Sequence, residues 1–263
     1  MMTDNSLRAL ALHALKQTTW PDKQAAIASI PSTAGIDVTS VLHCDVPLPG
    51  RPAQPLLVPP DQVPRRKLNT PAGRAALLHA LAHIEFNAIN LALDVVWRFP
   101  GMPPAFYTDW MTVAREEAYH FDMLSRHLAS LGVAYGDFAA HDGLWQMAAR
   151  TNDDLLARLA LVPRTLEARG LDVSPAIRDK LAQAGDAHAA GILDIILRDE
   201  IGHVSVGNKW FKWLCARENR LPVPTYRDLS QRYDAPRLKG PFNIPARRQA
   251  GFDDEEIEAL LAQ

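Results

Sequence analysis

A Glu-x-x-His motif occurs twice in this chain, each time inside a run of residues with helical periodicity. The first is Glu117-Ala-Tyr-His120 and the second is Glu200-Ile-Gly-His203. Residues three positions apart lie on one face of a helix, so each motif presents a carboxylate and an imidazole to the same point. Mixed oxygen and nitrogen ligands suit iron, manganese or zinc better than calcium or magnesium. The two motifs therefore predict metal chemistry.

A lone glutamate precedes each motif on an earlier helical segment. Glu85 comes 32 positions before Glu117, and Glu167 comes 33 positions before Glu200. Two consecutive antiparallel helices of about 40 Å bring mid-helix residues with this separation to the same height. Four glutamates and two histidines that converge in a helical bundle are the ligand set of a dinuclear carboxylate site.

Two divalent cations would offset the charge of four buried carboxylates, which are otherwise costly to bury. The expected ligands are Glu85, Glu117 and His120 for one ion, and Glu167, Glu200 and His203 for the other. Glu117 and Glu200 are expected to bridge the two ions and are the candidate catalytic residues. We expect two iron ions, with manganese or a mixed pair as the alternative.

Glu167 lies near a helix end, four residues after Pro163, and Asp153 or Asp194 is an alternative to it. Each ligand also has an ordinary structural interpretation. A glutamate on a helix is usually solvated or paired one turn away, and a histidine on an apolar face is usually a hydrogen-bonded core residue. Three aspartates could accept hydrogen bonds from the ligating histidines and so orient them: Asp94, Asp122 and Asp199. Two further histidines, His83 and His188, are expected to pack in the core.

The ligands must be positioned by helices. Residues 71–98 form the first, because Thr70 can cap it and Pro71 suits its first turn. Residues 104–131 form the second, which ends before Gly132.

The helices that would carry the second set of ligands contain more breaking residues. Residues 143–169 form the third helix, kinked at Pro163 and ended by Gly170. A fourth begins at Ser174-Pro175, breaks near Gly185 and continues to about residue 218.

Both ends of the chain differ from this central part. Residues 6–30 predict one or two short helices, 31–72 form a proline-rich arm that packs on the body, and 220–252 are irregular. A last helix over 254–262 is signalled by Asp253 and Glu256. The expected fold is all-α, a four-helix bundle with appendages. Its predicted parts are an N-terminal arm (1–72), a di-metal bundle (73–219) and a C-terminal arm (220–263).

Composition narrows the classes of protein further. The 263 residues are 48% hydrophobic and 22% charged, with a formal net charge of −2, so nothing global points to nucleic acid or an anionic membrane. Cys44 and Cys215 form no CxxC motif, which excludes zinc-ribbon and rubredoxin-like sites. We recognise no signal peptide and no apolar run long enough to span a membrane, and we expect a reducing cytoplasm.

Five stretches carry a resemblance to known proteins: HALAHIEFNAINLALDVVWRFPGMP, EEAYHFDML, YGDFAAHDGLW, LVPRTLEARGLDV and ILRDEIGHVSVGNKW. Over roughly residues 60–250 the chain resembles the ferritin-like superfamily, and more closely an uncharacterised bacterial family of ferritin-like proteins. The resemblance implies a four-helix bundle with a di-iron-type site and the same six ligands. It is more distant to rubrerythrins, whose four-cysteine domain is absent here, to ferritins, and to a bacterial tRNA hydroxylase.

The first functional interpretation is a non-haem di-iron oxidoreductase that activates dioxygen, similar to hydroxylases or oxidases, with an unknown substrate and an external electron donor. The two arms could wall a substrate pocket. An anionic substrate could meet basic residues of the C-terminal arm, or these could lie on the surface: Arg237, Lys239, Arg247 and Arg248.

The alternative is an iron-handling or peroxide-scavenging protein without an organic substrate; a structural protein with a vestigial site is the third interpretation. A homodimer is compatible with each interpretation, and no membrane partner is expected. Nucleic acid is not expected either, although the distant resemblance leaves a tRNA substrate open.

Overall fold

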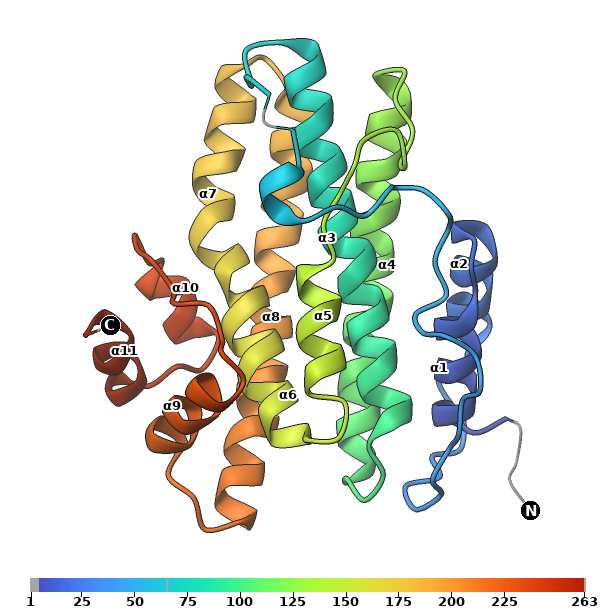
Figure 1. Cartoon of the computed structure of the whole chain (residues 1–263), viewed down its shortest axis with the longest axis vertical. Helices are drawn as coiled ribbons and strands as arrows, with labels where there is room; N and C mark the ends of the chain where they lie inside the picture. The colour runs from blue at the N-terminus through green and yellow to red at the C-terminus, as the bar shows by residue number, and fades with distance from the viewer. Residues whose placement is uncertain (1–4, 65, 263) are drawn as a thin grey trace. The chain divides into compact units, whose positions relative to one another are not determined.

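The computed structural model describes residues 5–64 and 66–262, which form helices joined by loops (Figure 1). Across these described residues there is no β-strand, only an isolated bridge between Leu57 and Ala140. The prediction of an all-α fold is confirmed. Contacts divide the chain into two compact units, Met1–Gly143 and Leu144–Gln263. The predicted division into a bundle with two arms stays a prediction.

The described part of the first unit contains two short helices, a single 3-10 turn and two long helices. These are α1 (Leu7–Lys16), α2 (Trp20–Ser29), η1 (Pro60–Gln62), α3 (Pro71–Arg98) and α4 (Pro104–Ser130). The long helices pack side by side as a hairpin (Figure 1). α3 begins where predicted, because the Thr70 hydroxyl accepts the amide hydrogen of Gly73 at 3.1 Å. α4 ends as predicted before Gly132, whose φ of +74° suits glycine.

α3 is the described helix whose length and composition would also fit a membrane span, since its apolar residues surround much of the helix. Inside the structure, however, 78% of its most apolar window is buried. α1 and α4 both pack against it. It therefore has the surroundings of a core helix.

The proline-rich segment of the first unit packs on the helices, as predicted. Arg8 of α1 is fully buried and donates to the carbonyl oxygens of Asp37 at 3.0 Å, Ser40 at 2.7 Å and Trp97 at 2.7 Å. One guanidinium thus joins this segment to the last turn of α3, where backbone carbonyls lack helical partners.

α2 packs against α1 and α4 in the first unit. Its Lys23 is fully buried, and Nζ donates to the carbonyl oxygens of Ala14 at 3.0 Å and Leu15 at 3.1 Å. The same ammonium lies 5.8 Å from the ring centroid of Phe86 on α3. Burial lowers the pKa of Lys23 to about 7.

In the second unit the helices are shorter and more interrupted than predicted. They are α5 (Gly143–Arg150), α6 (Leu155–Leu161), the π-helix η2 (Val162–Glu167), α7 (Ala168–Gln183), α8 (Ala187–Arg217), α9 (Pro222–Arg232), α10 (Ile244–Gln249) and α11 (Asp254–Leu261). A continuous helix over 143–169 is therefore wrong. Asp154 caps α6 by accepting from the amide of Ala157 at 2.9 Å, and buried Arg158 donates to the Thr151 hydroxyl at 2.9 Å across the break.

The predicted boundary at residues 170–175 is also wrong, because α7 runs through Gly170 and Pro175. Pro175 has no amide hydrogen to give the carbonyl of Leu171, one turn earlier. The side-chain amide of Asn243 donates to that carbonyl at 3.1 Å instead. A distant segment thus satisfies the group that proline leaves open. The predicted break near Gly185 is confirmed, with φ of +84° there.

The segment 220–252 is not irregular throughout, since α9 and α10 lie within it. α11 and its capping box between Asp253 and Glu256 are confirmed. The surface position considered for Arg247 is wrong, because its exposed fraction is 1% and it pairs with Asp172 of α7 through two hydrogen bonds of 3.0 and 2.7 Å. This buried ion pair fixes α10 against α7.

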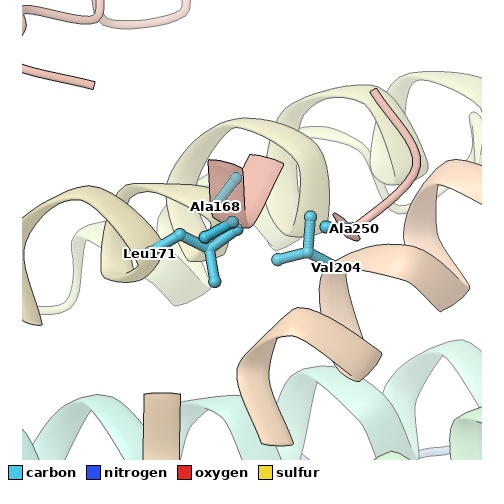
Figure 2. Packing of buried hydrophobic residues seen from close by; sticks show 5 residues of the cluster. Ala168, Leu171, Val204 and Ala250 are labelled. Carbon is cyan, nitrogen blue, oxygen red and sulfur yellow. The ribbon is translucent and has the colours of Figure 1, made fainter. Parts of the chain in front are cut away.

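α7 and α8 pack closely through small and branched apolar side chains. Ala168 and Leu171 of α7 meet Val204 of α8 and Ala250 beyond α10 (Figure 2). One turn along α8 from this cluster, Gly207 faces Pro163 of η2. A β-carbon at Gly207 would lie only 2.6 Å from the Pro163 β-carbon. The absence of a side chain at Gly207 therefore allows η2 to approach α8.

We expect Gly207→Ala to destabilise the protein by roughly 1–3 kcal/mol, because the added methyl group would be forced into Pro163. Gly191→Ala on the same helix is the control. No atom lies within 4 Å of the carbon added there, so alanine should stabilise by about 0.5–1 kcal/mol. Urea denaturation measures the change in unfolding free energy for both variants. Equal changes at the two glycines would contradict the close approach of Pro163 to Gly207.

Lys23 should make stability depend on pH. Its folded pKa of about 7 lies below the ordinary value of about 10.4. Between these values the unfolded state binds more protons, so stability rises from about pH 7 to about pH 10 and is lost as the pH falls. Lys23→Met should remove roughly 2 kcal/mol of the difference in unfolding free energy between about pH 7.5 and 9.5, measured by urea denaturation.

The exposed Lys16 of α1 provides the control for this experiment. Lys16→Met should keep the wild-type pH dependence. If Lys23→Met also keeps it, the lowered pKa of Lys23 is wrong.

Candidate metal centre

Three of the predicted ligands meet inside the first unit. Glu85 comes from α3, and Glu117 and His120 come from α4; their exposed fractions are 5%, 1% and 0%. Each offers one ligand atom, and these atoms lie within 4.8 Å of one another. His120 Nδ1 lies 3.3 Å from Glu85 Oε2 and 3.6 Å from Glu117 Oε2. The i, i+3 spacing and the helical hairpin thus produce the predicted convergence.

The members of this cluster shift one another's pKa values. Burial raises the pKa of Glu85 well above its usual value, and the neighbouring Glu117 carboxylate raises it further. Burial alone would lower the pKa of His120, but Glu117 and Glu85 together raise it to about 11. Among the described residues, Glu85 Oε2 has no hydrogen-bond partner. Two buried carboxylates beside one imidazole are a donor set that fits a divalent transition metal.

A group of packed aromatic side chains includes the residues that directly follow two of the ligands, and we did not predict this group from the sequence. Phe86 and Phe121 directly follow the ligands Glu85 and His120, and their ring centroids lie 5.4 Å apart. Tyr135 packs on both rings, and Trp20 of α2 packs on Phe121 at 4.5 Å. The available signal was a phenylalanine immediately after a ligand on each helix. This packing fixes α3 against α4 at the height of the ligands.

The second unit holds a smaller arrangement on a single helix. Glu200 and His203 of α8 have exposed fractions of 9% and 1%, and His203 Nδ1 lies 3.3 Å from Glu200 Oε1. Glu167 is half-buried at the last position of η2. The structure brings Glu200 and His203 together within this unit but does not place Glu167 in a cluster with them. Its role as a ligand stays a prediction.

Other candidates have different roles. The alternatives to Glu167 are both exposed, and Asp194 pairs with Arg178 at 2.9 Å. His83 packs as expected, with Nδ1 2.9 Å from the Tyr135 hydroxyl, whereas His188 is exposed at the start of α8, so its predicted packing is wrong. Each carboxylate proposed to orient the histidines lies against an arginine, and its orienting role stays a prediction: Asp94–Arg98, Asp122–Arg126 and Asp199–Arg198.

Glu85→Gln should separate the electrostatic cost of this cluster from its metal binding. In metal-free protein we expect the variant to raise the free energy of unfolding by roughly 1–2 kcal/mol, because it removes a buried carboxylate that Glu117 repels. The stabilisation that added ferrous or manganous ion gives to the wild type should be lost. Thermal denaturation with and without metal measures both effects.

Glu116→Gln is the control, since Glu116 adjoins the cluster on α4 but is only half-buried. It should keep the full response to metal. A Glu85→Gln protein that metal stabilises as much as the wild type would show that Glu85 is not a ligand.

Known proteins match most of the chain. A family described as "Protein of unknown function (DUF455)" matches residues 3–258. An "Uncharacterized protein" of Haemophilus influenzae is 50% identical over 214 residues, which cover 79% of this chain and 74% of that protein. No solved structure is detectably similar. The expected membership of an uncharacterised family is confirmed, and the chain belongs to the DUF455 family.

Proposed function

We propose that this protein is a ferritin-like, non-haem di-iron oxidoreductase that uses dioxygen to oxidise a substrate. The observation that carries the proposal is the buried cluster of Glu85, Glu117 and His120, in which two carboxylates and an imidazole nitrogen converge. The imidazole nitrogen Nδ1 of His120 lies 3.3 Å from Glu85 Oε2 and 3.6 Å from Glu117 Oε2. Such a donor set favours iron or manganese.

A second ion is supported by the repetition of the motif. Each Glu-x-x-His motif directs the Nδ1 atom of its histidine toward its own glutamate, at 3.6 Å for His120 and 3.3 Å for His203. Two motifs with the same local geometry suit two equivalent ions. Under the proposal, Glu167, Glu200 and His203 would hold the second ion.

A bound ferrous pair would supply the electrons for dioxygen reduction. The chain's own residues would hold the ions and keep water away. Phe86 and Phe121, which follow Glu85 and His120 in the sequence, pack on one another and on Tyr135. The sequence has only two cysteines, so it offers no cysteine-rich electron-transfer domain. The electrons would therefore come from an external donor, and the reducing cytoplasm is the proposed compartment.

The first test is the number of irons per chain after anaerobic reconstitution with ferrous iron and desalting. The wild type should bind two, measured by elemental analysis. Glu117→Ala/Glu200→Ala should bind fewer than one, because it removes one carboxylate ligand from each proposed ion. The control Glu116→Ala/Asp194→Ala removes two acidic residues from the same helices, α4 and α8, and should still bind two.

Oxygen uptake then distinguishes the two functional interpretations. An oxygenase should consume dioxygen beyond the oxidation of its own iron once an electron donor and a suitable substrate are present. Iron loading far above two per chain, without such uptake, would replace the proposal with iron handling. A wild-type protein that binds no iron would refute both.

A further inference from the structure

We propose that the C-terminal helix α11 sets the position of Glu167 through a buried contact between Glu256 and Arg164. The inference rests on the proposed function, in which Glu167 is a metal ligand. It adds two positioning residues that would not themselves touch metal. All of the residues involved belong to the second unit.

The segment that carries Glu167 needs to be held in place. η2 is a π-helix, a form that is rare and usually occurs as a single turn near functional sites. Pro163 favours it, since proline has no amide hydrogen for an α-helical bond. A π-turn contains about one residue more than an α-turn, so relaxation to α-helix would turn Glu167 by about 100° around the axis. The direction of the Glu167 carboxylate therefore depends on the contacts that keep η2 in the π-helical form.

Arg164 lies in the middle of η2 and is almost wholly buried, with 3% of its side chain exposed. Its Nε donates to the side-chain oxygen of Asn208 on α8 at 2.5 Å, and its Nη2 donates to Glu256 Oε1 on α11. The guanidinium also lies 4.1 Å from the ring centroid of Phe211. Three contacts from two other helices thus fix this side chain three residues before Glu167.

Glu256 is itself held on α11 and α8. Its Oε2 accepts the backbone amide of Asp253 at 3.0 Å in the capping box of α11, and it lies 2.8 Å from Lys212 Nζ. The side-chain amide of Asn208 donates to the carbonyl of Ala250, just before α11, at 2.7 Å. η2, α8 and the end of the chain are consequently joined by one polar network.

The same network relates Glu167 to the other two ligands of its unit. α8 carries Glu200 and His203, and also carries Asn208 and Lys212 of the network. η2 is therefore fixed against the helix from which those ligands project. Glu167 is thereby held in a set position relative to Glu200 and His203.

A role in positioning explains why this ion pair is buried at all. The exposed fractions of the Arg164 and Glu256 side chains are 3% and 5%, so both lose most of their hydration. The attraction within such a pair often does little more than offset that loss, and apolar residues of similar size can be equally stabilising. A pair whose net stabilisation is small is better explained by the one conformation that it specifies.

The test is the affinity of the full-length protein for ferrous iron, titrated anaerobically, with the thermal stability of each metal-free variant measured alongside. Glu256→Ala should weaken one of the two irons at least about tenfold, as loss of a residue behind a ligand typically does. Glu256→Gln keeps a hydrogen-bond acceptor for Arg164 and the capping box, so it should restore near wild-type affinity. Glu255→Ala, an exposed neighbour on α11, should change neither iron.

Removal of Glu256 alone leaves a buried arginine without its carboxylate, which could unfold the protein. Arg164→Met/Glu256→Leu replaces both charges of this ion pair with apolar side chains, so the double variant should stay folded. It should nevertheless lose affinity for one iron. Folded Glu256→Ala and double variants that bind two irons with wild-type affinity would overturn the inference and leave the proposed function standing. A wild type that binds no iron would refute the proposed function, and the inference with it.

Discussion

Two carboxylates held beside one imidazole in an apolar interior are the interaction on which the first unit depends. Glu85 and Glu117 are almost completely buried, and burial together with the Glu117 carboxylate raises the pKa of Glu85. A core made only for stability would place apolar residues at these positions, as α3 does with Leu81, Ala82 and Ala88 one turn from Glu85. The surrounding packing therefore has to hold a cluster that would otherwise be hydrated or separated.

Buried cations lie beside several segments where the chain departs from regular helix. Arg8 joins the N-terminal segment to the end of α3, Arg158 spans the break between α5 and α6, and Arg247 fixes α10 against α7. Arg164 links η2 to α11 in the same manner. The guanidinium group suits this use because it presents five donors in a fixed plane. The irregular segments are consequently specific parts of the packed structure, attached at defined points.

Local pattern predicted the helices that carry the first three ligands, because α3 and α4 have signals near their own ends. Thr70 and Pro71 mark the start of α3, and Gly132 follows the end of α4. The same reasoning failed between residues 143 and 183, where the deciding contacts come from distant parts of the chain. Pro175 is tolerated inside α7 since Asn243 donates to the carbonyl that proline leaves open. No local signal around residue 175 could have indicated that contact.

The predicted ligands also differ in whether local sequence or distant contacts determine their positions. Glu85, Glu117 and His120 could be predicted to converge because helical spacing and a short hairpin determine their positions. Glu167 could be predicted by its type and its distance from Glu200, but its direction depends on η2. That π-helix is set by Pro163, by its approach to Gly207, and by contacts with α11, which lies about 90 positions further along the chain.

These contacts give the two ends of the chain a structural role beside the helices that bear the candidate ligands. The family match runs from residue 3 to residue 258, so it includes the N-terminal helices and most of α11. In the structure, α2 supports the aromatic residues beside Glu85 and His120, and α11 holds the helix that carries Glu167. The segments that first suggested appendages thus contact the very helices that bear the candidate ligands. A metal site in this family would then be a property of the whole chain, since the long helices alone lack the contacts that orient their carboxylates.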